Sequence, residues 1–337
     1  MSRLVLTRPQ ILAFRRQVGA LDERLPPGDG SLRRAAWAGL QDSMPRAAVL
    51  SIHARVEEAG PSAWDDPSLV QVWGPRFSAY VVAAEDLAFF TLGRLPDDAE
   101  GLRRAEATAA RLQAFLAGRT MTSREAGRGM GVHPSSLRYA VLTGTVLVRW
   151  EGAGQPTIRT VPRPDVDPVD ARLELARRYL HVFGPATAES FAEWAGIRPQ
   201  RARAVFESLG PSLTPVRSPI GEGWVLAEDE PAFRAAAVPP APARLLPSGD
   251  AYFLLQGADR EILVPDVDRR SKLWTPRVWP GALLVEGDVV GTWRRDQRKV
   301  TINVWHRLSR AAVDAVAAEA ASLPLPGSGE IAVRWDD

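Results

Sequence analysis

The chain has 337 residues, of which 45% are apolar and 24% charged, and its formal net charge is +2. These values are typical of a globular protein of two or three domains. No run approaches the roughly 20 apolar residues of a membrane span, and the start, MSRLVLTRPQ, lacks the apolar core of a secretion signal. We therefore expect a cytoplasmic protein without membrane contact.

Cysteine is absent, which excludes disulfides and thiolate metal sites, and the four histidines are scattered along the chain. We expect neither a metal centre nor a cofactor. All but two of the 42 basic residues are arginine, the exceptions being Lys272 and Lys299. Arginine suits phosphate and guanine edges, but a GC-rich genome favours the same bias, so the bias alone proves nothing about DNA.

A helix, a tight turn and a second helix recur three times, and each second helix begins at a proline: Pro45, Pro134 and Pro199. Proline fits a first helical turn because its φ is preset and its missing N–H would be unpaired there. A pair of strands is expected after each second helix. Helix, turn, helix and hairpin form a winged helix-turn-helix, a fold that holds duplex nucleic acid.

In chain order, the first unit has expected helices at 8–20, 32–42 and 45–58 and strands at 69–72 and 79–82. In the second unit, a helix at 99–117 precedes a capping box, Thr122 to Glu125. Another helix follows Pro134, and strands at 145–150 and 157–161 flank a glycine-rich turn. The third unit has expected helices at 172–183, 187–195 and 199–210 and strands at 213–217 and 224–227.

The composition then changes. Residues 235–247 form a proline-rich linker, and short β-like runs follow: YFLLQ, EILVP, ALLVEG, VVGTW and KVTINVW. These runs predict a small β-barrel or curled sheet, closed by a helix at 309–322. The predicted fold is α+β: winged helices at 1–97, 98–165 and 166–234, then a linker and β-rich domain at 235–337.

Four segments in this order carry a resemblance: GLQDSMPRAA at 39–48, VWGPR to VAAEDL at 72–87, LLPxxD at 245–250 and VxGxVVGTWRR at 285–295. Together they resemble the bacterial AlkZ/YcaQ family of tandem winged-helix DNA glycosylases, which remove bulky alkylated purines and unhook interstrand cross-links. The resemblance implies a DNA-repair enzyme that hydrolyses the N-glycosidic bond in damaged double-stranded DNA, with water as its only co-substrate.

The family's catalytic pair is two polar residues that flank an apolar one. Carried over, the first residue of the pair is Gln41. Ser43 stands at the third position and Asp42 at the usually apolar one, and either of these two could replace the family's second residue. We expect Gln41 to orient the water, Asp42 to offset the positive charge of the reacting sugar and Ser43 to add a weaker hydrogen bond. The residues alone also allow a structural interpretation, in which Asp42 ends a helix, Ser43 caps the next and Gln41 is solvated.

Arginines at the turns, helices and hairpins are expected to contact phosphate, although charged clusters are often merely solvated. His53 lies on an apolar helical face and is predicted to be a core histidine. Trp73 and Trp150 border the wings, where core packing is favoured over contact with a sugar or base. The residues expected at DNA are Arg46, Arg55, Arg76, Arg138, Arg201, Arg203, Arg294, Arg295, Arg298 and Lys299.

We expect a monomer. Because the Gln41–Ser43 motif departs from the family pattern, a DNA-binding protein or regulator without catalysis is the main alternative. A protein–protein scaffold is a weaker one, since winged helices also bind proteins and the net charge is near zero.

Overall fold

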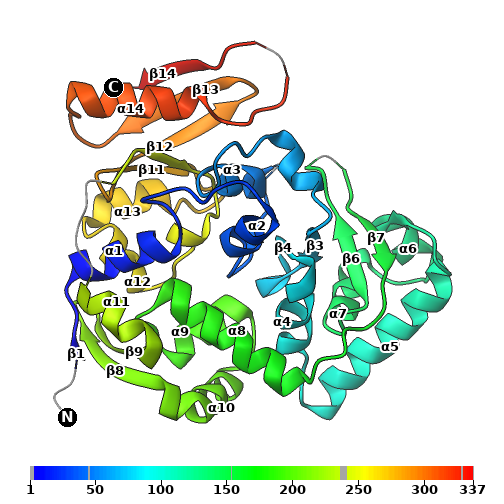
Figure 1. Cartoon of the computed structure of the whole chain (residues 1–337). Coiled ribbons are helices and arrows are strands. Elements are labelled where there is room, and N and C mark those ends of the chain that lie inside the picture. The colour runs from blue at the N-terminus through cyan, green and yellow to red at the C-terminus, as the bar shows by residue number, and fades with distance from the viewer. Residues whose placement is uncertain (1–3, 45, 153, 236–240, 328, 337) are drawn as a thin grey trace.

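A computed structural model describes residues 4–44, 46–152, 154–235, 241–327 and 329–336 (Figure 1). Within these ranges the chain is a mixed α+β protein, as predicted, with three sheets of three strands and one of five. Pro45, which was predicted to open a helix, lies outside the described residues. Among the described residues, no helix has the length and apolar character needed to cross a bilayer.

Four segments are named here by the predicted ranges: the first is 1–97, the second 98–165, the third 166–234 and the last, or C-terminal, segment 235–337. The first segment contains a sheet with strand order β2-β4-β3. Its strands are β2 (Leu40–Gln41), β3 (Leu69–Trp73) and β4 (Ala79–Ala83). Its α-helices are α1 (Arg8–Val18), α2 (Asp29–Ala35), α3 (Ala47–His53) and α4 (Leu87–Thr91). Four short 3-10 turns complete it: η1 (Pro61–Asp65), η2 (Pro75–Phe77), η3 (Ala84–Asp86) and η4 (Leu92–Arg94).

The helix predicted at 32–42 is wrong at its end, because α2 stops at Ala35 and Gln41 lies on a strand. Gly39 turns the chain with a φ of +72°, and a Cβ there would come within 2.9 Å of the Tyr80 ring. Only glycine combines that backbone conformation with so close an approach. Leu40 then pairs with Val81 and Gln41 with Tyr80 in an antiparallel ladder.

The second segment has the sheet order β5-β7-β6. Thr122 and Glu125 form the predicted capping box, since Thr122 Oγ1 accepts from Glu125 N at 3.2 Å and the Glu125 carboxylate accepts from Thr122 N at 3.0 Å. The elements are α5 (Ala99–Leu116), β5 (Met121–Thr122), α6 (Ser123–Gly129), η5 (Pro134–Leu137), α7 (Arg138–Val141), β6 (Val146–Arg149) and β7 (Thr157–Thr160).

The third segment includes a strand from the start of the chain. β1 (Leu4–Val5) pairs in parallel with β8, giving the sheet order β1-β8-β9. Helix α1 lies beside α11 and α8, so the N-terminal part of the chain is fastened to this segment (Figure 1). The elements are α8 (Pro168–Phe183), α9 (Ala188–Ala195), α10 (Pro199–Leu209), η6 (Gly210–Ser212), β8 (Leu213–Ser218), β9 (Gly221–Leu226), η7 (Ala227–Asp229) and α11 (Glu230–Ala235).

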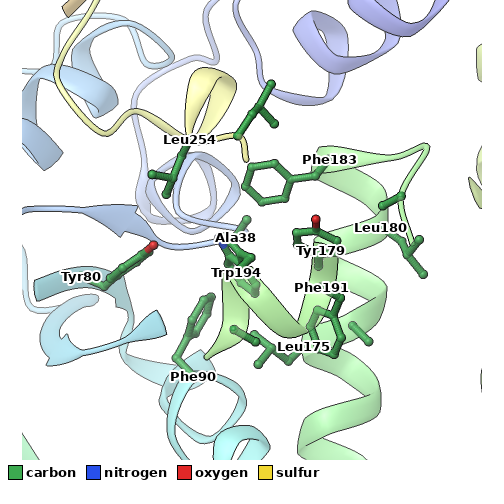
Figure 2. Packing of buried hydrophobic residues seen from close by; sticks show 14 of the residues in the cluster. Ala38, Tyr80, Phe90, Leu175, Tyr179, Leu180, Phe183, Phe191, Trp194 and Leu254 are labelled. Atoms are coloured by element: carbon green, nitrogen blue, oxygen red, sulfur yellow. The ribbon is translucent and has the colours of Figure 1, made fainter. Parts of the chain in front are cut away.

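One large core joins the three segments. Figure 2 shows Phe90 and Tyr80 of the first segment facing Leu175, Tyr179 and the aromatic side chains of α8 and α9. The side chains of these four residues, Phe90, Tyr80, Leu175 and Tyr179, are each at most 3% exposed. Burial of large apolar side chains is worth about 1.5–3 kcal/mol each, so this shared core holds the three small sheets in one arrangement.

The last segment is an open five-stranded sheet, and the predicted barrel is wrong. Its strands run in order from β10 at one edge to β14 at the other, and α14 (Arg310–Ala321) leads from β13 to a parallel β14. The sheet does not need to close because α14 packs against it and covers its apolar side chains. The strands are β10 (Arg244–Leu246), β11 (Gly281–Val285), β12 (Asp288–Asp296), β13 (Lys299–Val304) and β14 (Ala332–Asp336).

Two of the predicted β-like runs are not strands, because each overlaps a helical turn or helix. YFLLQ lies over η8 (Ala251–Phe253), and EILVP begins within α12 (Asp259–Leu263), which α13 (Val267–Leu273) follows. Asp250 starts the first turn by accepting from Tyr252 N at 2.9 Å. A short apolar run has the same pattern in a buried strand and in a buried helix, so the sequence did not separate them. The final predicted helix, at 309–322, is confirmed by α14.

Helix α3 belongs to two cores at once. Leu50 packs with the C-terminal sheet, whereas Val49 and Ile52 pack with the first segment. All seven residues of the helix are buried. The turn that precedes α3 is therefore fixed by both parts of the molecule.

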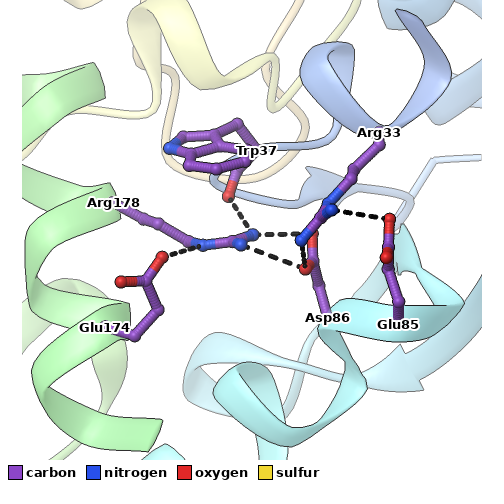
Figure 3. Close-up of polar contacts among 6 residues, drawn as sticks. All are labelled: Arg33, Trp37, Glu85, Asp86, Glu174 and Arg178. Atoms are coloured by element: carbon purple, nitrogen blue, oxygen red, sulfur yellow. Dashed lines mark hydrogen bonds and ion pairs between the residues drawn. The ribbon is translucent and has the colours of Figure 1, made fainter. Parts of the chain in front are cut away.

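A buried ion network joins α2 and α8 through η3. Asp86 is fully buried and accepts from Arg178 Nη1 at 2.7 Å and from Arg33 Nη2 at 2.7 Å (Figure 3). The guanidinium of Arg178 also stacks 3.9 Å from the Trp37 ring centre and binds Glu174. The two arginines neutralise a carboxylate that would otherwise be an unpaired buried charge, which is costly. The Asp of the VAAEDL segment therefore has a structural role.

Candidate active site

The Gln41–Ser43 turn runs from the end of β2 toward the start of α3. Gln41 is half-buried and Ser43 is exposed. Gln41 Nε2 donates a short hydrogen bond to Ser43 Oγ. Gln41 Oε1 is buried and has no hydrogen-bond partner among the described residues. A buried acceptor without a partner is rare in proteins and calls for an explanation.

A loop from the C-terminal segment packs against Gln41. A Cβ placed on Gly249 would lie 3.3 Å from Gln41 Cδ, and Gly249 has a φ of +78°. The loop follows β10, so the chain brings residues from distant parts of the sequence together here. Gly249 thus limits the conformations open to the Gln41 side chain.

Asp42 points into the protein and is 1% exposed. Its Oδ1 accepts from Ala48 N at 3.0 Å, and its Oδ2 accepts from Gln71 Nε2 at 2.8 Å and from Trp64 Nε1 at 3.2 Å. Burial raises the pKa of Asp42 to about 6, against the opposing effect of these hydrogen bonds and of Arg46. The Asp42 side chain therefore holds the start of α3 and does not face solvent. The structural interpretation is wrong in its details, because α2 ends at Ala35, well before Asp42, and Ser43 does not cap α3.

Trp64, one of the Asp42 donors, makes two cation–π contacts. The guanidinium carbons of Arg46 and Arg149 are 4.0 Å and 3.2 Å from its ring centre. Arg149 also forms an ion pair with Asp65. These contacts fix the indole, and with it the N–H that binds Asp42.

A hollow of about 130 Å³ adjoins this turn. Met44, Ala47 and Leu50 form one wall, and the C-terminal segment forms the other. The rest of the lining comprises Pro247, Ser248, Val278, Trp279, Pro280, Gly281, Trp293, Arg294 and Arg295. Met44, which follows the Gln41–Ser43 turn, thus lines the same hollow as Arg294 and Arg295 of β12, a proximity that the sequence did not show.

Among the residues expected at DNA, several are accessible. Arg294 is exposed and donates to Val278 O at 3.1 Å. Arg138 is exposed, with its guanidinium carbon 5.6 Å from the centre of the Trp73 ring. Arg203 is exposed and pairs with Glu189 at 2.9 Å. Arg76 is exposed, and Arg46, Arg295, Arg298 and Lys299 are half-buried.

Two of the expected arginines are placed where phosphate cannot reach them. Arg55 is 3% exposed and binds both carboxylate oxygens of Asp250 at 2.7 Å. Arg201 is 8% exposed and pairs with Asp97 while donating to Leu95 O at 3.2 Å. Arg55 is neutralised by a buried carboxylate and Arg201 by an exposed one, so both buried guanidinium groups already have an anionic partner within the protein.

Arg298 donates hydrogen bonds to backbone carbonyls within the C-terminal segment. Its Nη1 donates to Leu325 O at 2.9 Å and to Gly327 O at 3.0 Å, and its Nη2 donates to Gly329 O. These carbonyls belong to the connection between α14 and β14. Arg298 therefore ties that connection to the β12–β13 hairpin.

His53 is a core histidine, as predicted. It is 8% exposed, its Nε2 lies 3.1 Å from Ser322 Oγ, and burial lowers its pKa. Trp73 is 5% exposed and packs in the main core, whereas Trp150 is half-buried. In the described part of the chain, no group of three or more histidine, aspartate or glutamate residues could hold a metal ion.

The sequence analysis missed the groups that surround the turn. Gln71 and Trp64 carried no recognisable signal, because a single amide or indole in an apolar stretch looks like ordinary core. Asp250 did carry one, as the last residue of the LLPxxD segment. Its carboxylate accepts from Arg55, from Ser51 Oγ at 2.6 Å and from Tyr252 N, so the motif builds the loop that holds Gln41.

The chain resembles known proteins both in sequence and in structure. The family model described as "DNA glycosylase AlkZ-like" matches residues 34–324. An interstrand DNA cross-link repair glycosylase of Streptomyces sahachiroi is 31% identical over 166 residues, a stretch that spans 48% of this chain and 43% of that protein. The solved structure of the DNA glycosylase AlkZ of Streptomyces sahachiroi shares the fold, with a TM-score of 0.79 at 20% identity over 99% of this chain and 100% of that one. Since the family model covers most of its length, the chain belongs to the AlkZ-like DNA glycosylase family.

Proposed function

We propose that this chain is a monomeric, cytoplasmic DNA glycosylase that hydrolyses the N-glycosidic bond of alkylated or cross-linked purines in duplex DNA. One observation carries the proposal beyond family membership. Gln41 and Ser43 form a hydrogen-bonded polar pair whose buried acceptor, Gln41 Oε1, has no partner among the described residues. The pair adjoins a surface that bears Arg294 and Arg295.

The chemistry needs little from the protein. A purine alkylated at N3 or N7 already carries positive charge, so its glycosidic bond is weakened before binding. Gln41 Oε1 accepts a hydrogen bond from the attacking water and directs its lone pair at C1′. Ser43 Oγ, bound to Gln41 Nε2, keeps the amide in the orientation that presents Oε1. The water oxygen bonds to C1′ as the bond from C1′ to nitrogen breaks; the cationic base takes that electron pair and leaves as a neutral purine, and the proton of the water passes to solvent.

Asp42 supplies negative charge from behind the turn. It does not touch the sugar, because its carboxylate is enclosed by Ala48, Trp64 and Gln71. A charge inside the protein nevertheless acts over several ångströms at low effective dielectric. With a pKa of about 6, the group is ionised at neutral pH and stabilises the developing positive charge of the sugar.

We further propose that each three-stranded sheet and its helices form one winged helix: the first two lie within 1–97 and 98–165, and the third combines β1 with residues 166–234. The basic β12–β13 hairpin of residues 235–337 contacts the duplex beside the site. Phosphate contacts from Arg294 and Arg295 give affinity independent of sequence that falls with salt. The adjoining hollow of about 130 Å³ is below the roughly 300 Å³ of a small-molecule pocket, which supports reading a bulky lesion without enclosing the flipped base.

A single-turnover excision assay tests the proposal. The substrate is a duplex with one N7-methylguanine, and a second duplex carries a cross-linked or bulky purine adduct. Release of free base, with an abasic site left in the strand, is the expected result. Failure to release base from either duplex, with DNA binding intact, would remove the glycosylase function.

A DNA-binding protein without catalysis is the second candidate. Asp42 favours it, because its carboxylate already accepts hydrogen bonds from three protein donors. In the same assay this candidate predicts salt-dependent binding of damaged and undamaged duplex without an abasic product. The two candidate functions differ in whether an abasic strand is formed, and not in the affinity for duplex DNA.

A further inference from the structure

We propose that Gln71 is a positioning residue: its side-chain amide ties the Asp42 carboxylate to the backbone of the second segment at Trp150 and so fixes the Gln41–Ser43 turn. The inference rests on the proposed function. The second segment contributes no residue to the turn. Through Gln71 it nevertheless helps to set the active-site geometry.

The contacts of Gln71 define a short relay. Gln71 lies on β3 and is 5% exposed. Its Nε2 donates to Asp42 Oδ2 at 2.8 Å, and its Oε1 accepts from Trp150 N at 2.5 Å. Nε2 also makes a long contact of 3.5 Å with Trp150 O. One amide thus binds both Asp42 and the backbone of the second segment. Trp150 directly follows β6, and β6 lies beside β3 (Figure 1).

A second contact from the same strand supports the relay. Arg149, the last residue of β6, stacks on Trp64, and Trp64 Nε1 donates to the same Asp42 oxygen as Gln71. Two neighbouring residues, Arg149 and Trp150, thus act on Asp42 through separate intermediates. The strand end of the second segment is therefore coupled to the turn through one carboxylate oxygen.

The position requires a group that donates to a carboxylate and accepts from a backbone N–H. A neutral amide does both. Methionine has a similar length and can do neither. An introduced glutamate can do both only while it holds a proton, and two carboxylates side by side share one proton over part of the pH range.

The charged groups that face Asp42 do not titrate near neutrality. Arg46, on the α3 side, acts on Asp42, and Arg295 of β12 is acted on by it. Arg149 reaches the site through Trp64. Arginine stays protonated throughout the useful range, so a change in an acid limb near pH 6 reports on the carboxyl group.

The test compares full-length wild type with Gln71→Met in single-turnover excision of N7-methylguanine from duplex DNA. The rate constant at saturating enzyme should fall about 10- to 100-fold, the loss expected for one hydrogen bond to a charged group. Affinity for undamaged duplex should stay within about twofold. Because the carboxylate loses a donor, the acid limb of the pH profile should move to higher pH.

The Gln71→Glu variant provides the rescue. While the introduced carboxyl and Asp42 share a proton, both hydrogen bonds are restored and excision at pH 6 should exceed that of Gln71→Met. At higher pH the proton is lost, so this variant should show an alkaline limb that wild type lacks. A purely structural role for Gln71 predicts no such limb.

Thr143→Val is the stability control. Thr143 is 2% exposed and donates to Ala140 O at 2.7 Å in the second segment, away from the turn. It should lower the melting temperature without altering the pH profile. Equal rate constants and acid limbs for wild type and Gln71→Met would overturn the proposal.

A titration independent of excision separates this inference from the proposed function. The ¹³C carboxyl signal of Asp42 is followed with pH in wild type and in Gln71→Met. Its midpoint should rise in the variant even if wild type releases no base, in which case only the glycosylase function fails. An unchanged midpoint would refute the Gln71 contact whatever the excision assay shows.

Discussion

Arg55 and Asp250 form a two-point ion pair inside the protein, with each guanidinium Nη 2.7 Å from one carboxylate oxygen. Arg55 directly follows the α3 region, and Asp250 ends the loop that carries Gly249. The pair therefore joins the helix after the candidate turn to the loop that packs on Gln41. A contact between two distant parts of the sequence thus underlies the site geometry.

Removing one member of this pair should be costly. Asp250→Ala leaves the Arg55 charge buried without its partner, and we expect a loss of about 3–5 kcal/mol in the free energy of unfolding. Chemical denaturation measures it. Asp288→Ala removes a more exposed partner, paired with Arg8 at 2.6 Å, and should cost less than about 1 kcal/mol. Similar losses in the two variants would contradict the assigned role of the Arg55–Asp250 pair.

Gly249→Ala should impair excision through Gln41. The new Cβ would lie 3.3 Å from Gln41 Cδ, in addition to the strain of a φ of +78°. Gly118→Ala is a matched control, since Gly118 has a φ of +81° and no atom within 4 Å of an added Cβ. Both should lose about 1 kcal/mol of stability. Only Gly249→Ala should lower the excision rate constant, and a parallel loss in the control would refute the contact.

Gln41→Ala should lower the single-turnover rate constant by about 10²-fold or more, because it removes the acceptor that directs the water. Affinity for duplex DNA should remain near the wild-type value. Ser43→Ala removes only the group that orients the amide, so its loss should be smaller. A large loss of DNA affinity in Gln41→Ala would count against a positioned water.

The pH dependence should follow Asp42. Its pKa is raised by burial to about 6, and the ionised form is the one that stabilises the cationic sugar. Excision should therefore fall as the pH decreases through about 6, and Asp42→Asn should be slow at every pH. A profile that is flat from pH 5 to pH 8 would remove Asp42 from the mechanism.

Ionisation of Asp42, which should favour excision, should disfavour folding. Between its ordinary value of 3.8 and about 6, the folded state holds the Asp42 proton while the unfolded chain has lost it. The contribution of Asp42 to the free energy of unfolding should thus decrease as the pH rises through this window. Denaturation of wild type and Asp42→Asn at pH 4 and pH 7 would show the difference.

Arg294→Ala with Arg295→Ala should weaken binding to all duplexes alike and reduce the slope of log affinity against log salt by one to two units. Arg234→Ala is the control, since Arg234 is exposed on α11 and paired with Glu230 at 2.7 Å. Fluorescence anisotropy at several salt concentrations gives the slope. If the slope does not change in the double variant, the β12–β13 hairpin lies outside the interface.

Local signals allowed much of the fold to be predicted. Pro199 opens α10, and the capping box at Thr122 opens α6, because both effects depend on neighbouring residues only. Gln41 was placed on a helix because the pairing with Tyr80 that makes it a strand depends on a residue far along the chain. For the same reason the sequence left a closed barrel among the two expected forms of the C-terminal sheet, which is open, since strand order is not a local property.

The candidate site, like the fold, could be predicted only where the signal was local in the sequence. Family resemblance located the Gln41–Ser43 turn and the basic hairpin, and in the structure Met44, next to the turn, lines the same hollow as Arg294 and Arg295 of the hairpin. It could not show that Asp42 faces inward, because a carboxylate beside a helix start fits both an exposed and a buried position. Nor could it show that Arg55 and Arg201 are neutralised by Asp250 and Asp97, which lie far from them in sequence.

The double burial of α3 has a consequence for how the molecule is divided. Leu50 closes the core of the C-terminal sheet, while Val49 and Ile52 close that of the first segment. One short helix thus completes both bodies, and neither is intact without it. The C-terminal sheet is accordingly not an appendage that can be cut away, and any split of the chain between them would expose hydrophobic surface and release the polar turn at once.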